Sequence, residues 1–150
     1  MVVNRQRGIA VAVRPLEDFA GRARRALRFP EDGVTVCLVS DAAIARLNRR
    51  YRGKFGPTDV LSFPANGRRR NSRSAPRGPA RGTQAGYVGD IAISPAAARR
   101  NAHRDSRSLS EELRVLILHG MLHLAGYDHE TDDGRMDRLE RRMRRRLGLR

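Results

Sequence analysis

The segment of the chain that decides its fold is SLSEELRVLILHGMLHLAGYDH, residues 108–129. Ser108 followed by Glu111 is a capping box, and the apolar run behind it predicts an α-helix. That helix carries His119 and His123. Residues four apart on a helix share one face and lie roughly 6 Å apart, so we expect both imidazoles to project in the same direction.

A third histidine follows at the end of the same segment. Gly126 supplies the left-handed residue that ends a helix, and the turn it allows brings His129 back toward the first two rings. Three neutral imidazoles with no fourth protein ligand are typical of a catalytic zinc site with an open position. The sequence therefore predicts one zinc ion per chain, held by His119, His123 and His129.

The histidine spacing matches the H-E-x-x-H-x-x-G-x-x-H pattern of the metzincin proteases, with one difference. Gly120 stands where those proteases carry the glutamate that acts as general base. A zinc peptidase is therefore disfavoured. The alternative for the histidines is that His119 and His123 are ordinary helix residues, one packed in the core and one exposed.

Size and charge limit the remaining choices. A chain of 150 residues suits one domain, and we expect residues 1–150 to form a single unit. The formal net charge is +15, and nearly all the positive charge is arginine. Because the guanidinium group pairs with phosphate oxygens at two points, nucleic acid is the expected partner, ahead of an anionic membrane surface.

The single cysteine and the absence of a long apolar segment bear on the compartment. Cys37 is alone, so no disulfide framework exists, and it is interpreted as a small buried hydrophobe. The sequence shows neither a signal peptide nor a run of about 18 apolar residues. We expect a cytoplasmic protein without a membrane segment, monomeric by default.

Hydrophobic periodicity predicts alternating strands and helices, with an apolar stripe on the last helix opposite an arginine-rich face. A loop punctuated by glycine and proline separates the second helix from the third strand and holds Arg52 and Lys54 on a turn. We expect the third and fourth strands to pair as a hairpin. The expected strands are 8–13, 34–39, 59–63 and 87–93, and the helices open near Pro15, at Ser40, Ser94 and Ser108, and at Thr131 or Asp132.

The segment 66–86 is rich in Gly, Pro, Ser and Arg and contains no acidic residue. This composition cannot bury a core, so we expect a flexible loop. It is either a solvated insertion or an arginine-rich tether that becomes ordered on RNA, with Arg68, Arg69 and Arg70 as candidate RNA-binding residues.

These segments together closely resemble the bacterial YbeY family of rRNA maturation factors. The resemblance rests on the histidine segment, on YRGK at 51–54, on PTDVLSFP at 57–64 and on Gly-Asp-Ile at 89–91. It implies an α/β, zincin-like single domain with a mixed four-stranded sheet and surrounding helices. The segment 66–86 departs from the family by its length and its basic charge.

The resemblance also implies a function and a catalytic residue. It implies a zinc-dependent, single-strand-specific endoribonuclease acting on ribosomal RNA of the small subunit, in 16S rRNA 3′ end maturation and ribosome quality control. Arg52 would be the functional arginine of the cleft. Asp128 and Glu130 flank the third ligand and could support the histidines or act as base. The alternative is a non-enzymatic, ribosome-associated RNA-binding protein in which zinc is structural.

Overall fold

The computed structural model describes residues 1–65, 86–128 and 133–149. The predicted ligand His129, the flanking Glu130 and the arginines Arg68, Arg69 and Arg70 lie outside these ranges. The elements in chain order are β1 (Val2–Asn4), α1 (Val13–Ala26), β2 (Val34–Leu38), α2 (Asp41–Arg52), β3 (Val60–Pro64), β4 (Gly89–Ile93), α3 (Pro95–Arg104), α4 (Leu109–Leu124) and α5 (Arg135–Arg146).

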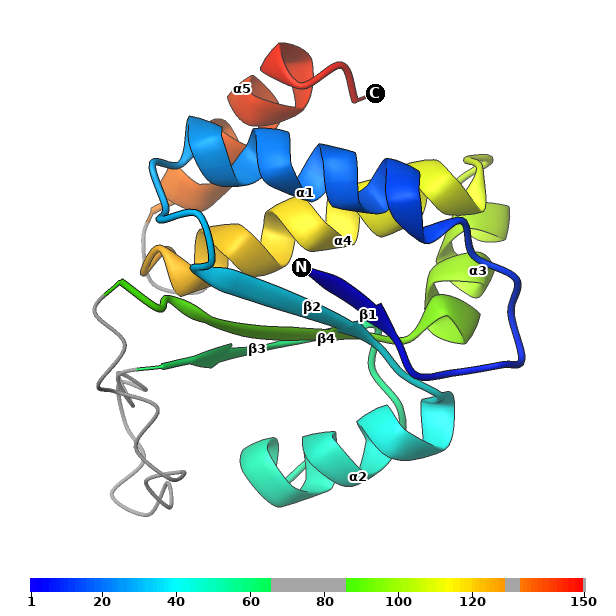
Figure 1. The fold of residues 1–150 in the computed structure, drawn as a ribbon. Helices are drawn as coiled ribbons and strands as arrows, with labels where there is room; N and C mark the ends of the chain where they lie inside the picture. The colour runs from blue at the N-terminus through cyan, green and yellow to red at the C-terminus, as the bar shows by residue number, and fades with distance from the viewer. Residues whose placement is uncertain (66–85, 129–132, 150) are drawn as a thin grey trace.

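The four described strands form one mixed sheet in the order β1-β2-β4-β3. The first three run parallel, and β3 pairs antiparallel with β4, as the predicted hairpin requires. Helices α1 and α4 cover one face of the sheet and α2 the other (Figure 1). The predicted class, a mixed four-stranded sheet with surrounding helices, is confirmed.

Helix α4 lies at the centre of the core and contacts α1, α3, α5, β3 and β4. It is buried on almost every side, which explains its continuous apolar run. Helix α5 contacts α4, and its predicted apolar stripe packs into the same core. The stripe consists of Met136, Leu139, Met143 and Leu147. The histidines at the end of α4 therefore lie on the most buried of the described helices.

The predicted helix starts at three serines are confirmed. The hydroxyl oxygens of Ser40, Ser94 and Ser108 each accept a hydrogen bond from the backbone N–H three residues later. Helix α2 ends at Gly53, whose φ of 65° is the left-handed conformation expected of a glycine stop. The boundaries of α2, α3 and α4 thus follow from local chemistry.

The strand predicted at 8–13 is wrong. The first strand is β1, and residues 8–12 connect it to α1, which begins at Val13. The Gln6 side chain hydrogen-bonds the backbone of this connection. Its amide accepts from the Ile9 N–H at 2.9 Å and donates to the Ile9 carbonyl at 2.8 Å. A side chain thus occupies backbone groups that a sheet would otherwise pair.

The predicted start of the last helix is also wrong. Helix α5 begins at Arg135, with Gly134 in a left-handed conformation at the N-cap, and no side chain caps it. Thr131 and Asp132 lie outside the described residues. None of the helices in the described part of the chain combines the length and apolar composition that a membrane crossing needs.

Candidate active site

His119 and His123 meet at the C-terminal end of α4, as their spacing predicts. Their Nε2 atoms are 3.1 Å apart, and their ring centroids are 4.7 Å apart. Both side chains are half-buried. The helix therefore aims two ring nitrogens at a common point near the surface.

Glu140 on α5 contacts His119 through Nδ1, the ring nitrogen that does not face His123. Its Oε1 atom lies 3.2 Å from His119 Nδ1 and 3.6 Å from Arg144 Nη2. Burial alone would raise the pKa of the Glu140 carboxyl, but the hydrogen bond and charge interaction with His119, aided by Arg144, outweigh it and lower the pKa. An ionised Glu140 suits the tautomer in which His119 Nδ1–H donates a hydrogen bond to Oε1, and in that tautomer the lone pair of His119 is on Nε2.

These contacts fit a zinc ion. Two nitrogens that each lie about 2.0–2.1 Å from one tetrahedral zinc are about 3.4 Å apart, close to the 3.1 Å observed. A carboxylate behind a ligating histidine is the usual partner of such a site. Within residues 1–65, 86–128 and 133–149, no three His, Cys, Asp or Glu side chains are grouped to hold a metal. The third predicted ligand, His129, lies outside these ranges.

Close packing against the sheet explains why position 120 is a glycine, which the sequence alone did not show. A Cβ at this position would lie 2.8 Å from Cγ2 of Ile91, a fully buried residue of β4. On β3, the strand that pairs with β4, the Ser62 hydroxyl donates to the Gly120 carbonyl at 3.1 Å. Position 120 therefore faces the sheet at close range, and any side chain there would have to displace the buried side chain of Ile91.

Arg52 and Lys54 are exposed at the end of α2. Figure 1 shows that this end of α2 and the histidine end of α4 lie toward the same end of the molecule, with β3 and β4 between them. Tyr51 packs edge-on against Phe63 of β3 at 5.2 Å between ring centroids, which fixes the end of α2 to the sheet. None of the hydrogen bonds, ion pairs or ring contacts described above joins Arg52 to either histidine, so its role stays a prediction.

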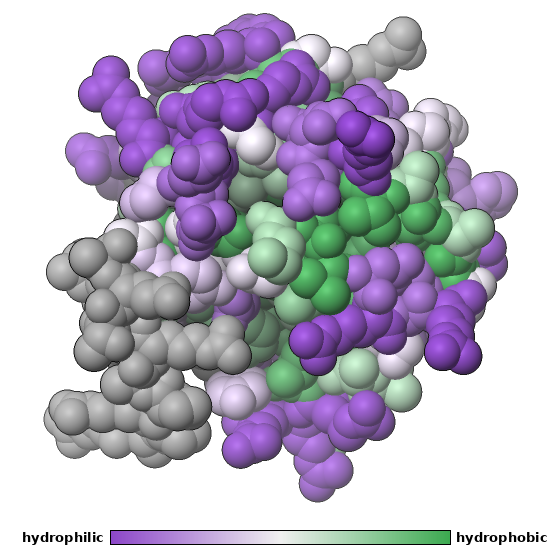
Figure 2. All heavy atoms as spheres, in the orientation of Figure 1, coloured by the Kyte–Doolittle hydropathy of each residue, from purple (hydrophilic) through white to green (hydrophobic). Residues whose placement is uncertain are grey.

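The arginines of α5 separate into two groups. Arg144 is half-buried and turned back toward Glu140, whereas the others are exposed. Figure 2 shows hydrophilic side chains gathered over α5 and α1. The exposed arginines of α5 are Arg135, Arg138, Arg141, Arg142, Arg145 and Arg146.

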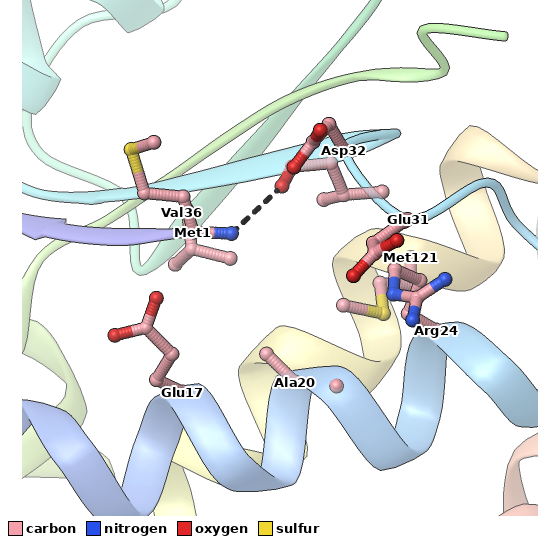
Figure 3. A pocket seen from close by; sticks show the side chains of 10 residues that line it. Met1, Glu17, Ala20, Arg24, Glu31, Asp32, Val36 and Met121 are labelled. Atoms are coloured by element: carbon pink, nitrogen blue, oxygen red, sulfur yellow. Dashed lines mark hydrogen bonds between the residues drawn. The ribbon is translucent and has the colours of Figure 1, made fainter.

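A cavity of about 260 Å³ lies elsewhere, between α1 and the edge of the sheet at β1 and β2 (Figure 3). Glu17, Glu31 and Asp32 line it, and Met121 contributes to its wall. These three carboxylates outnumber the one cationic side chain of the lining, Arg24, so the cavity does not favour a polyanion. Neither histidine lines the cavity, so it is separate from the candidate active site.

Comparison with known proteins supports one family. A family model described as Endoribonuclease YbeY matches residues 5–148. The chain is 41% identical over 149 residues to an endoribonuclease YbeY of Koribacter versatilis, covering 99% of this chain and 86% of that protein. It is 40% identical over 129 residues to one of Solibacter usitatus, covering 85% of this chain and 76% of that protein.

A solved structure agrees with the fold. The solution structure of a Thermotoga maritima protein superposes with a TM-score of 0.56 and 28% identity, covering 95% of this chain and 85% of that one. The class that these matches define is the nucleases, a group of hydrolases. Within that class, the chain belongs to the endoribonuclease YbeY family, which confirms the resemblance that the motifs indicated.

Sequence reasoning missed Glu140. A signal was present, because Glu140 stands between Met136 and Met143 on the apolar stripe of a helix whose other charges are mostly arginine. A lone carboxylate at a core position needs a partner. The candidates named from sequence behave differently: Asp128 is exposed, and Glu130 is outside the described residues.

Proposed function

We propose that this protein is a zinc-dependent endoribonuclease that cuts single-stranded RNA. The observation that carries the proposal is the 3.1 Å approach of His119 Nε2 and His123 Nε2, with Glu140 behind His119. Family membership supports RNA as the substrate. The third ligand we propose is His129, which follows the last residue of α4 by five positions in the sequence.

The residues divide the chemistry among them. His119, His123 and His129 would hold the metal, and Glu140 orients the first ring and fixes its tautomer. A zinc ion bound there would lower the pKa of a bound water to about 7 and would polarise a phosphoryl oxygen. Arg52 binds the scissile phosphate and stabilises the charge that grows in the transition state. No general base is assigned, since Gly120 faces the sheet.

The substrate we propose is single-stranded ribosomal RNA of the small subunit, in 16S rRNA 3′ end maturation and ribosome quality control, in the cytoplasm. The net charge of +15 supports a polyanionic partner, since each phosphate contact releases counterions and adds affinity. Lys54, Arg68, Arg69 and Arg70 are the further RNA contacts we propose. We propose a monomer as the acting unit.

The decisive experiment compares wild-type protein with His123→Ala on single-stranded and duplex ribosomal RNA, with zinc measured on the same samples. We expect wild type to cut the single strand only and His123→Ala to cut neither. Chelation separates the rival function: it should stop cleavage but spare folding and RNA affinity. Joint loss of folding and RNA binding would instead indicate a structural zinc in a non-enzymatic RNA-binding protein.

Product ends distinguish two nucleophiles. A cyclic 2′,3′-phosphate indicates attack by the RNA's own 2′-hydroxyl. Cleavage of a substrate with a 2′-deoxy residue at the scissile position indicates attack by water. Mass spectrometry of the short products identifies either outcome.

A further inference from the structure

Phe55 has the most exposed large apolar side chain of the described residues. It is 84% exposed, and within the described residues only Met1 is a comparably exposed large hydrophobic. A single exposed apolar residue is common and carries no meaning by itself. The residues around Phe55 are the reason to assign it a function.

The turn that presents Phe55 is held in place by one buried residue. Asn48 is 5% exposed, and its Nδ2 donates to the Gly56 carbonyl at 3.0 Å. The backbone carbonyl of Asn48 accepts from the Lys54 N–H at 3.4 Å, so Asn48 is hydrogen-bonded to the residue on each side of Phe55. The ring is thus fixed through its backbone while its surface stays in solvent. A preorganised contact of this kind loses little entropy on binding.

The charged residues of the segment that carries the ring, residues 42–58, are all positive. The Arg49 guanidinium carbon lies 5.4 Å from the centroid of the Phe55 ring, within cation–π range. Arg52 and Lys54 are exposed next to it, and no acidic residue occurs between 42 and 58. Figure 2 shows hydrophilic side chains at the bottom of the molecule, where α2 lies. An aromatic ring inside a cationic surface suits a ligand that is both planar and anionic.

We propose that Phe55, with Arg49, is a stacking platform for one unpaired nucleobase, while Arg52 and Lys54 contact the flanking phosphates. Every base presents a π face, so such a platform accepts any sequence. A base inside a duplex is already stacked on both sides, so the platform discriminates against duplex RNA. The proposal deepens the proposed function and rests on RNA being the ligand.

The position of the platform suits this role. The end of α2 lies toward the same end of the molecule as the histidine end of α4 (Figure 1). The packing of Tyr51 on Phe63 fixes the end of α2 to β3, and Ser62 of β3 donates to the carbonyl of Gly120 in α4. The turn that carries Phe55 is thereby connected to the histidine helix through one strand, β3.

The test is equilibrium binding of a single-stranded 2′-O-methyl oligoribonucleotide that carries one 2-aminopurine, with the duplex of the same sequence alongside. Stacking on the ring should quench the fluorescence in the wild-type complex. Phe55→Ala should remove the quenching and weaken single-strand binding roughly 5- to 150-fold, while duplex binding stays the same. Phe55→Trp should keep both the quenching and the single-strand affinity of the wild type, whereas Phe55→Leu should keep neither fully.

Salt dependence separates stacking from charge. Phe55→Ala should leave the slope of log affinity against log salt unchanged, whereas Lys54→Gln should reduce it by about 1. Arg49→Gln has a matched control in Arg22→Gln. The Arg22 guanidinium lies 5.6 Å from the ring of Phe19, which is 1% exposed and cannot receive a base. Only Arg49→Gln should weaken single-strand binding.

Unchanged affinity and quenching in Phe55→Ala would overturn the proposal, and so would an equal loss of single-strand and duplex binding. Thermal melting checks that the variant folds, as the exposure of the side chain predicts. The two proposals fail separately. A wild-type protein that quenches 2-aminopurine but cuts no RNA would contradict the nuclease function and leave the platform standing.

Discussion

The histidine end of α4 and the turn after α2 are built in opposite ways. At the histidines, side chains fix one another: His119 contacts His123 and Glu140, and both rings are half-buried. At the turn, the backbone is fixed by Asn48, while Arg52, Lys54 and Phe55 extend into solvent. The two proposed metal ligands in the described residues are therefore held by neighbouring side chains, whereas Arg52 and Lys54 are held through the backbone of the turn and have exposed side chains.

The largest effect should come from the histidine end. His123→Ala should lower RNA cleavage by roughly a thousandfold or more, because several kcal/mol of charge stabilisation disappear with the metal. The measurement is single-turnover cleavage of a labelled single strand. His103→Ala, which removes an exposed histidine of α3, is the control and should be neutral. Equal activity in both variants would remove His123 from the mechanism.

The second effect tests the turn. Arg52→Ala should reduce cleavage roughly a hundredfold or more, because the loss of a transition-state contact costs about 3–4 kcal/mol. Zinc content should not change. Arg99→Ala, an exposed arginine on α3, is the matched control. If Arg52→Ala raises KM and leaves kcat intact, Arg52 serves binding alone and the two regions differ less than proposed.

The third effect asks whether Glu140 orients His119. Glu140→Gln should weaken zinc binding about 10- to 100-fold, since a neutral amide holds the Nδ1 proton less strongly. A chelator competition assay measures the affinity. Asp137→Asn, on the exposed side of the same helix, should leave it unchanged. Normal zinc affinity in Glu140→Gln would show that the carboxylate is only a packing partner of α5.

The fourth effect tests the close packing beneath the histidines. Gly120→Ala gains helix propensity of about 1 kcal/mol but forces a Cβ against Ile91, and overpacking costs about 1–3 kcal/mol. We expect a net fall in the free energy of unfolding, measured with urea. Gly8→Ala, where a Cβ meets nothing within 4 Å, should not lower stability. A more stable Gly120→Ala protein would mean that α4 shifts easily on the sheet.

The smallest effect concerns the other end of α2. Asp41 Oδ2 lies 2.8 Å from Arg100 Nη1, and this hydrogen bond, opposed by burial and helped by Ser94, lowers the pKa of Asp41. A lowered folded-state pKa stabilises the protein above the unfolded value of about 3.9, and the gain is lost as the pH falls through the folded pKa.

Because the Asp41 pair is on the surface, Asp41→Asn should cost at most about 1 kcal/mol at pH 7. The difference from wild type should fade as urea unfolding is repeated below about pH 4. Asp18→Asn, an exposed carboxyl on α1, is the control. A difference that stays constant across this range would assign the effect to the cap region of α2 and not to the ion pair.

Sequence predicted best where local chemistry is sufficient. Ser40, Ser94 and Ser108 fixed helix starts, and the spacing of His119 and His123 fixed their convergence, because both depend on a few neighbouring residues. Contacts between distant segments were not visible. Glu140 reaches His119 across 21 positions, and Ile91 excludes a side chain at Gly120 only because α4 crosses β4. Sequence likewise could not show that Gln6 satisfies the connection after β1.

The most direct test of the account is a zinc titration of metal-free protein, with cleavage of single-stranded RNA measured at each addition. We predict that activity rises to a plateau at one zinc per chain in the wild type. We also predict that His119→Ala, His123→Ala and His129→Ala each stay inactive and fail to retain the ion. A protein that holds one zinc through these histidines and leaves every RNA intact would contradict it.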